Sequence, residues 1–194
     1  MRGPFIAIAM AFLWAVPALA DTVAPQAAAT VSPAQHRADQ LDILFAKLHQ
    51  ATDAAAAKTI EQNIWALWMV SDSPTAEVLL QQATKALDDG AWEPSLAILN
   101  RLIGAYPDYA EAWNKRATLY FAMGRYDESL ADIVKVLDLE PRHFGALSGR
   151  GMIFEKRKDY AAAIDAFREA LGIDPNLDGA KSAVEALEKI ERPI

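Results

Sequence analysis

The 194-residue chain contains no cysteine, and this absence excludes several kinds of protein at once. Without a thiol, the chain cannot form disulfide bonds, use a thiolate nucleophile or carry a lipid anchor on a cysteine. An oxidising compartment would therefore neither stabilise nor threaten its fold.

Histidine is scarce, and the glycine-rich motifs of catalysis are missing. The three histidines, His36, His49 and His143, lack the paired spacing that metal ligands adopt. The sequence contains no Gly-x-Ser-x-Gly elbow and no glycine-rich phosphate loop. Neighbouring carboxylates such as Asp88 and Asp89 stand at expected helix ends, where solvated charge is ordinary. We therefore predict a protein that is not an enzyme and that uses no metal and no other cofactor.

Positive charge is also in the minority. The chain has 19 lysines and arginines against 26 aspartates and glutamates, which gives a formal net charge of −7. No basic stripe interrupts this acidic balance, and an acidic surface repels phosphate backbones and anionic lipids. The charge predicts no nucleic-acid partner.

The one long apolar run lies near the N-terminus. The stretch FIAIAMAFLWAVPALA follows Arg2, and Ala18 and Ala20 are small residues of the kind that signal peptidase requires. We predict that residues 1–20 are a signal peptide cleaved after Ala20. The alternative is an uncleaved anchor, but the run is shorter than the about 20 apolar residues that span a bilayer. The expected mature protein has no integral membrane span and is periplasmic or secreted.

A period of 34 residues organises the C-terminal two thirds of the chain. Residues 76–109, 110–143 and 144–177 align with one another. A proline recurs near the end of each segment: Pro107, Pro141 and Pro175. A small residue recurs at the eighth place, where one helix is expected to cross the next: Ala83, Ala117 and Gly151. Each segment is therefore predicted to be a helix, a tight turn and a second helix.

This pattern resembles the tetratricopeptide repeat (TPR) family, most clearly in the middle copy, AEAWNKRATLYFAMGRYDESLADIVKVLDLEP. The resemblance extends to small exported bacterial TPR proteins of unassigned activity. It implies an all-α fold, a right-handed TPR-type α-solenoid of stacked helical hairpins with a C-terminal capping helix. Lys158 departs from the pattern, because the other two copies have Gly90 and Gly124 at this turn position.

The remaining segments flank the three repeats. Residues 21–37 lack a periodic apolar pattern and are predicted to be a disordered tether. Residues 38–72 show helical spacing but fall out of register, so they are predicted to be a divergent N-terminal hairpin, either a cap or a degenerate first repeat. The three repeats then occupy residues 73–177, and residues 178–194 are predicted to be the solvating cap.

The TPR resemblance places a concave groove along the first helix of each repeat, where a protein segment could bind. Phe121 and Asn114 of the central repeat are expected to be its main contacts and to be unnecessary for helix packing. The predicted peptide-groove residues are Leu80, Thr84, Leu87, Glu111, Asn114, Thr118, Phe121, Ser148, Met152 and Glu155. TPR domains that grip chaperone tails use lysine, asparagine and arginine at places where this chain has Leu80, Thr84, Gly145 and Gly149, so tail docking of that kind is not expected.

Two cations stand where the repeat usually has leucine. Arg116 and Arg150 could be neutralised within the array, with Asp132 as one candidate partner and Glu111 or Glu155 as another, or could extend past the core into water. If they instead face the groove, they would contact a ligand carboxylate.

The sequence thus predicts an exported, non-enzymatic interaction scaffold that binds a peptide segment of an envelope protein in its groove. One alternative is a structural homo-oligomer that pairs through an exposed region around Trp65 and Trp68 or through the C-terminal edge. Another is a regulatory subunit of an envelope enzyme, which would leave the same sequence pattern.

Overall fold

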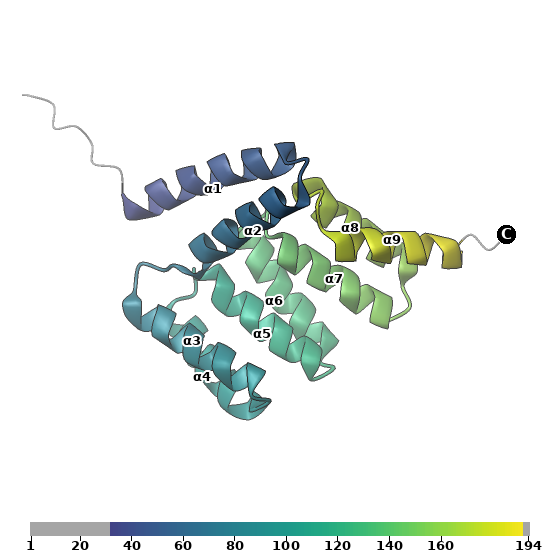
Figure 1. Cartoon of the computed structure of the whole chain (residues 1–194). Coiled ribbons are helices and arrows are strands. Elements are labelled where there is room, and N and C mark those ends of the chain that lie inside the picture. The colour runs from purple at the N-terminus through teal and green to yellow at the C-terminus, as the bar shows by residue number, and fades with distance from the viewer. Residues whose placement is uncertain (1–31, 192–194) are drawn as a thin grey trace, which may run out of the picture. The chain divides into compact units, whose positions relative to one another are not determined.

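A computed structural model describes residues 32–191, and this part of the chain is entirely helical (Figure 1). It contains nine α-helices: α1 (Pro33–Gln50), α2 (Ala54–Met69), α3 (Pro74–Asp88), α4 (Trp92–Ala105), α5 (Ala110–Ala122), α6 (Tyr126–Leu139), α7 (Phe144–Lys156), α8 (Tyr160–Ile173) and α9 (Asp178–Glu191). The predicted all-α, TPR-type solenoid is confirmed. None of the helices in residues 32–191 has the length and apolarity needed to cross a membrane.

The three repeats are the antiparallel pairs α3–α4, α5–α6 and α7–α8, and α9 packs on α8. Each pair turns through one residue in the left-handed region: Gly90 at φ 73°, Gly124 at φ 72° and Lys158 at φ 62°. Glycine adopts this conformation without steric cost, whereas the Cβ of a lysine is crowded there. The third repeat, with Lys158 in place of glycine, therefore has a strained turn with the same geometry as the turns of the other two repeats.

The small residues of the repeat lie where paired helices touch. Ser95 and Ser129 donate their hydroxyls to the carbonyls of Ala83 and Ala117, both at 2.8 Å, so the two backbones approach closely. In the third pair a Cβ on Gly151 would lie 2.8 Å from the Phe167 ring. The helix crossings expected from the sequence are thus at the predicted positions.

The first helix begins earlier than expected. The sequence predicts that the tether extends through residue 37, yet α1 starts at Pro33, because the Ser32 hydroxyl accepts the backbone N–H of Gln35 and proline suits a first helical position. Arg37, on this first part of α1, forms an ion pair with Asp72 at 3.2 Å. The predicted signal peptide and most of the predicted tether lie outside the described residues.

The hairpin α1–α2 does not continue the stack. Successive repeats are joined by close packing of α4 on α5 and of α6 on α7, and no comparable packing joins α2 to α3. Instead α2 contacts α5, and the apolar core of the hairpin includes Phe144 at the start of α7 (Figure 1). The hairpin therefore lies over the repeats, not at the end of the array as a cap or first repeat would.

Candidate functional site

Helix α2 occupies one end of the concave groove. Trp68 is only 8% exposed, and its ring stacks on His143 with centroids 4.1 Å apart and planes 9° apart. Trp65 meets Trp68, His143 and Phe144 edge-on. A Cβ on Gly145 would lie 2.7 Å from the Trp65 ring, so glycine at this groove position leaves room for the indole.

The two tryptophans are therefore packed inside their own chain. Their indole rings are thus not the exposed pairing surface that the homo-oligomer alternative places at Trp65 and Trp68, and pairing through the C-terminal edge stays a prediction. Other contacts hold the hairpin in place as well: Arg142 forms an ion pair with Asp42 at 2.6 Å and lies over the ring of Phe45.

A buried polar network lies beneath α2. His143 accepts the Ala146 amide at Nδ1, so its proton is on Nε2, which donates to Glu111 at 3.1 Å. Asn114 donates to both Glu111 oxygens at 3.1 Å, and Lys115 lies 3.3 Å away. Burial raises the pKa of Glu111, but the hydrogen bond from His143 and the charge of Lys115 outweigh it and hold the pKa below its ordinary value. The network thus keeps an ionised glutamate inside the molecule.

Several residues expected to line the groove are buried. Leu80 is fully buried in the core that the first repeat shares with α5, because its face of α3 turns inward. Glu111 and Asn114 are 1% and 8% exposed, because they belong to the network below α2. Asn114 is therefore needed for packing, contrary to expectation. Thr84 and Leu87 are half-buried, and Leu87 packs against the same first-repeat core.

The other predicted groove residues line two neighbouring hollows. A small one of about 80 Å³ is bordered by Thr118 and Phe121 of α5 and by Gly145, Gly149 and Met152 of α7. A larger cavity of about 600 Å³ is bordered by Ser148, Met152 and Glu155 of α7. Met152 borders both hollows and is 42% exposed. The structure thus brings these predicted residues together beside α2.

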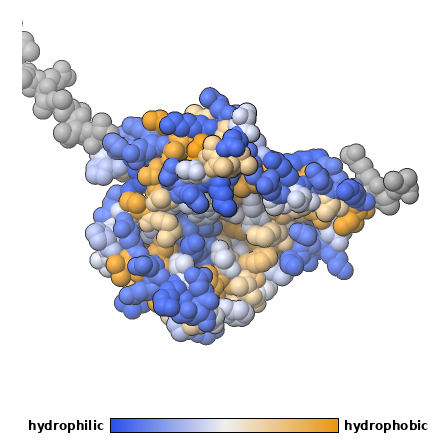
Figure 2. Space-filling view, viewed as in Figure 1, coloured by the Kyte–Doolittle hydropathy of each residue, from blue (hydrophilic) through white to orange (hydrophobic). Residues whose placement is uncertain are grey.

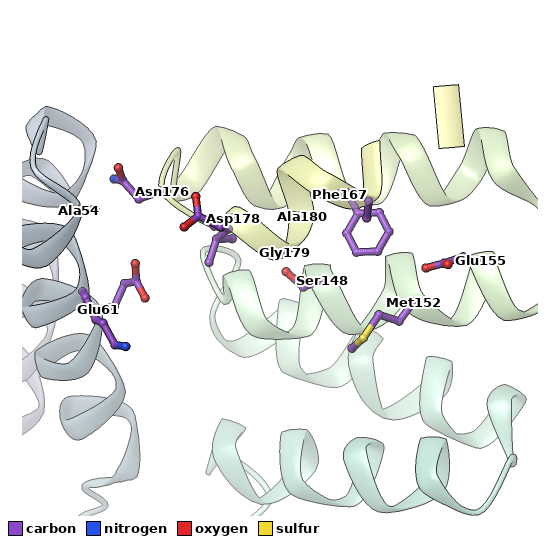
Figure 3. Close-up of a pocket in the computed structure, with 13 residues that line it drawn as sticks. Ala54, Glu61, Ser148, Met152, Glu155, Phe167, Asn176, Asp178, Gly179 and Ala180 are labelled. Carbon is purple, nitrogen blue, oxygen red and sulfur yellow. The ribbon is translucent and has the colours of Figure 1, made fainter. Parts of the chain in front are cut away.

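The larger cavity also has walls that sequence reasoning did not identify (Figure 3). Ala54, Lys58 and Glu61 come from α2, whereas Asn176 and Asp178 come from the turn into α9. The further lining residues are Phe167, Leu177, Gly179, Ala180 and Ala183. Since α2 lies more than 100 positions before this turn, no local sequence pattern could reveal that the two segments share a cavity.

A buried carboxylate lies next to this cavity. Asp174 is fully buried. Its Oδ1 atom accepts a hydrogen bond from the backbone N–H of Asn176 at 2.9 Å, whereas its Oδ2 atom has no hydrogen-bond partner. The side-chain nitrogen of Asn176 is also buried without a partner. Burial and the adjacent Asp174 carboxylate raise the pKa of Glu61 to about 7. The carboxyl groups of α2 and of the α8–α9 turn therefore lie close enough to oppose each other's ionisation.

Arg116 and Arg150 are paired within the array. Arg116 makes a two-pronged contact with Asp132, both hydrogen bonds being 2.8 Å long, and adds Asn100 at 2.7 Å. Asp132 is one of the partners that the sequence suggested, whereas Glu111, another of them, belongs to the network below α2. Arg150 pairs with Glu169 of α8 at 2.5 Å. Both guanidinium groups thus have a carboxylate of their own chain, and the suggested ligand contact is not needed to neutralise them.

Two further observations concern metal ligands and the surface of the molecule. In residues 32–191, no three histidines or carboxylates are arranged to hold a metal ion. The face seen in Figure 2 is a mosaic of hydrophilic and apolar residues without one broad apolar patch. A partner that approached this side of the molecule would meet hollows and not a flat hydrophobic face.

Paired helices with a 34-residue period and a groove along their first helices define a helical repeat protein of the kind that binds other proteins. A family model described as "Tetratricopeptide repeat" matches residues 80–133 and 114–178. The chain belongs to the tetratricopeptide repeat family.

Known proteins resemble the chain over most of its described part. A TPR repeat-containing protein of Rhizobium etli is 39% identical over 155 residues, which cover 80% of this chain and 74% of that protein. The translocon protein 64 at the outer membrane of chloroplasts from Pisum sativum is 25% identical over 152 residues, covering 78% of this chain but only 25% of that longer protein. The first TPR domain of Spaghetti (RPAP3), solved bound to the HSP90 peptide SRMEEVD, has a TM-score of 0.59 and 20% identity over 62% of this chain and 95% of that domain.

Proposed function

We propose that the protein is an exported, non-enzymatic scaffold that binds a short segment of an envelope protein in the part of the groove left open by its own hairpin. The observation that carries the proposal is the cavity of about 600 Å³ between α2, α7 and the start of α9, together with the adjoining hollow beside Met152. Membership of a protein-interaction family supports it.

The walls of the cavity suit a peptide. Met152 and Leu177 offer apolar surface, while Ser148 and Asn176 offer a hydroxyl and an amide. An extended segment exposes backbone donors and acceptors beside its side chains, so it needs this mixture of apolar and polar contacts. The TPR domain of RPAP3, which shares the helical arrangement, holds a peptide of seven residues, SRMEEVD.

Export rests on the sequence of residues 1–20, with Ala18 and Ala20 before the expected cut. The intact mass of the protein recovered from the periplasm or medium tests this part of the proposal. A chain that begins at Asp21 supports export and cleavage, whereas an exported chain that retains residues 1–20 contradicts the predicted cut.

Binding can be tested by filling the cavity. A phage-displayed library of random 12-residue peptides is selected on the protein, and the best binders are synthesised and titrated. Met152→Trp should weaken them at least tenfold, because a bulky ring at this partly exposed position blocks both hollows. Val134→Trp is the matched control, since Val134 is a similarly exposed apolar residue, 55% exposed on α6, and borders neither hollow. If both variants bind the peptides equally weakly, or if neither variant binds them more weakly than the unmodified protein, the peptides bind outside the two hollows.

A further inference from the structure

The cavity between α2, α7 and α9 has more negative than positive charge on its walls. Glu61, Glu155 and Asp178 line it, and Lys58 is the one cation among its lining residues (Figure 3). Asp174 adds a fully buried carboxylate beside Glu61. The cavity is therefore built to attract a positive group and to repel a carboxylate.

Groups beside the cavity also lack partners. Among the described residues, Glu61, Glu155 and Asp174 form no ion pair, and Asp178 has only a 3.6 Å contact with Lys181. While Glu61 is ionised, Asp174 Oδ2 and Asn176 Nδ2 are buried without hydrogen-bond partners, whereas a protonated Glu61 donates to Asp174. An unpaired buried carboxylate oxygen is costly, and a cation held nearby would offset this cost.

The remaining wall is apolar. Met152, Leu177 and Ala180 border the same cavity as the carboxylates. Lysine and arginine combine an aliphatic stem with a charged head, so their stems lie well on apolar surface while their heads reach polar groups. A small inorganic cation would leave this apolar wall unused.

We propose that the cavity receives a lysine or arginine side chain of the bound segment, with its stem on Leu177 and Ala180 and its head between Glu61 and Asp178. This inference rests on the proposed function, since it names the chemistry of the segment that the groove binds.

The test uses the peptides selected on the full chain from the random 12-residue library. Aligned binders should share a lysine or arginine at one position. Replacing an arginine there by citrulline, which has the same shape without the charge, should weaken binding to the unmodified protein at least tenfold. The same replacement should change binding to the Glu61→Gln, Asp178→Asn double variant by less than threefold, because the carboxylates that recognise the charge are gone.

Glu185→Gln supplies the control, since Glu185 is exposed on α9 and does not border the cavity. This variant loses one negative charge from the same helix and should keep the full tenfold discrimination. Discrimination that is equally lost in Glu185→Gln would show a general effect of charge and overturn the assigned site.

The outcomes separate the two proposals. If peptides bind in the groove but share no basic residue, or if the double variant still discriminates arginine from citrulline tenfold, the cavity does not recognise a cation and the proposed function stands. If the library yields no binder, both proposals fail.

Discussion

Exchanging each of two glycines of α7 for alanine tests whether the hairpin rests on the groove. Gly145 lies under Trp65, and an added Cβ would lie 2.7 and 2.9 Å from two atoms of the indole, closer than real contacts allow. Gly149 is one turn further along the same helix, where the Cβ would meet only Ile133 at 3.6 Å, an ordinary contact. The two substitutions are chemically identical and differ in whether the hairpin covers the position.

The expected magnitudes follow from these contacts. Alanine is favoured over glycine in a helix by roughly 0.5–1 kcal/mol, so Gly149→Ala should stabilise the protein by about that amount. Gly145→Ala gains less, because Gly145 lies in the first turn of α7, and it forces the Trp65 ring against its neighbours. Overpacking of this kind typically costs about 1–3 kcal/mol. The free energies of unfolding of the two variants should therefore differ by about 2 kcal/mol.

Urea unfolding of both variants measures this difference, and 5-fluorotryptophan NMR reports on the indole itself. The resonance of Trp65 should move in Gly145→Ala and stay in place in Gly149→Ala. If both variants are stabilised equally and no indole resonance moves, α2 does not lie on α7, and the cavity that α2 helps to form does not exist as described.

The remaining predictions concern the turns, a titrating carboxyl and the helix crossings. Lys158→Gly should raise the free energy of unfolding by about 1 kcal/mol, because it relieves a left-handed lysine, whereas Gly124→Ala should lower it by a similar amount; thermal melts compare the two. Glu61→Gln should stabilise the protein by about 1 kcal/mol above pH 7 and by much less below pH 4.5, after allowance for solvent screening of this partly exposed group. The sign follows because the folded-state pKa of Glu61 is raised from 4.5 to about 7, so the wild type loses stability as pH rises through this window; unfolding at pH 4 and pH 8 measures it. Ala117→Leu and Gly151→Leu should each lower the free energy of unfolding by about 1–3 kcal/mol or more, and unchanged melting of both would show that the helix crossings are misplaced.

The repeat architecture was predictable because it depends on neighbours in the sequence. A small residue every 34 positions marks a helix crossing, and the structure places Ala83, Ala117 and Gly151 at such crossings. The partner of Arg116 was also accessible, since Asp132 lies only 16 positions further on, in the second helix of the same repeat. Local spacing and the requirement to neutralise a buried charge are sufficient for inferences of this kind.

The position of the hairpin was not predictable, because it depends on contacts between segments far apart in the sequence. The repeat pattern alone predicts which side chains of each first helix face the groove. This prediction of exposure is wrong where a non-repeating segment covers the groove, as at Glu111. The sequence nevertheless contains two signs that the hairpin covers part of the groove. The tryptophans at 65 and 68 are large apolar residues in a segment without a register, and Gly145 leaves a gap at a groove position. The tryptophans and Gly145 indicate an indole ring packed against a backbone without a side chain. Neither feature indicates this by itself.

The covered groove has a consequence for how binding and folding are linked. Lys58 and Glu61 belong to α2, whereas Ser148 and Met152 belong to α7, so the cavity exists only while the hairpin lies on the repeats. A segment bound in it would contact both parts and would favour the docked hairpin by RT ln(1 + [L]/Kd), about 2.7 kcal/mol at a ligand concentration of one hundred times Kd. Conversely, a substitution that loosens the hairpin would weaken binding without touching the ligand. The specificity of this site therefore depends on the non-repeating hairpin as much as on the repeats that form the rest of the groove.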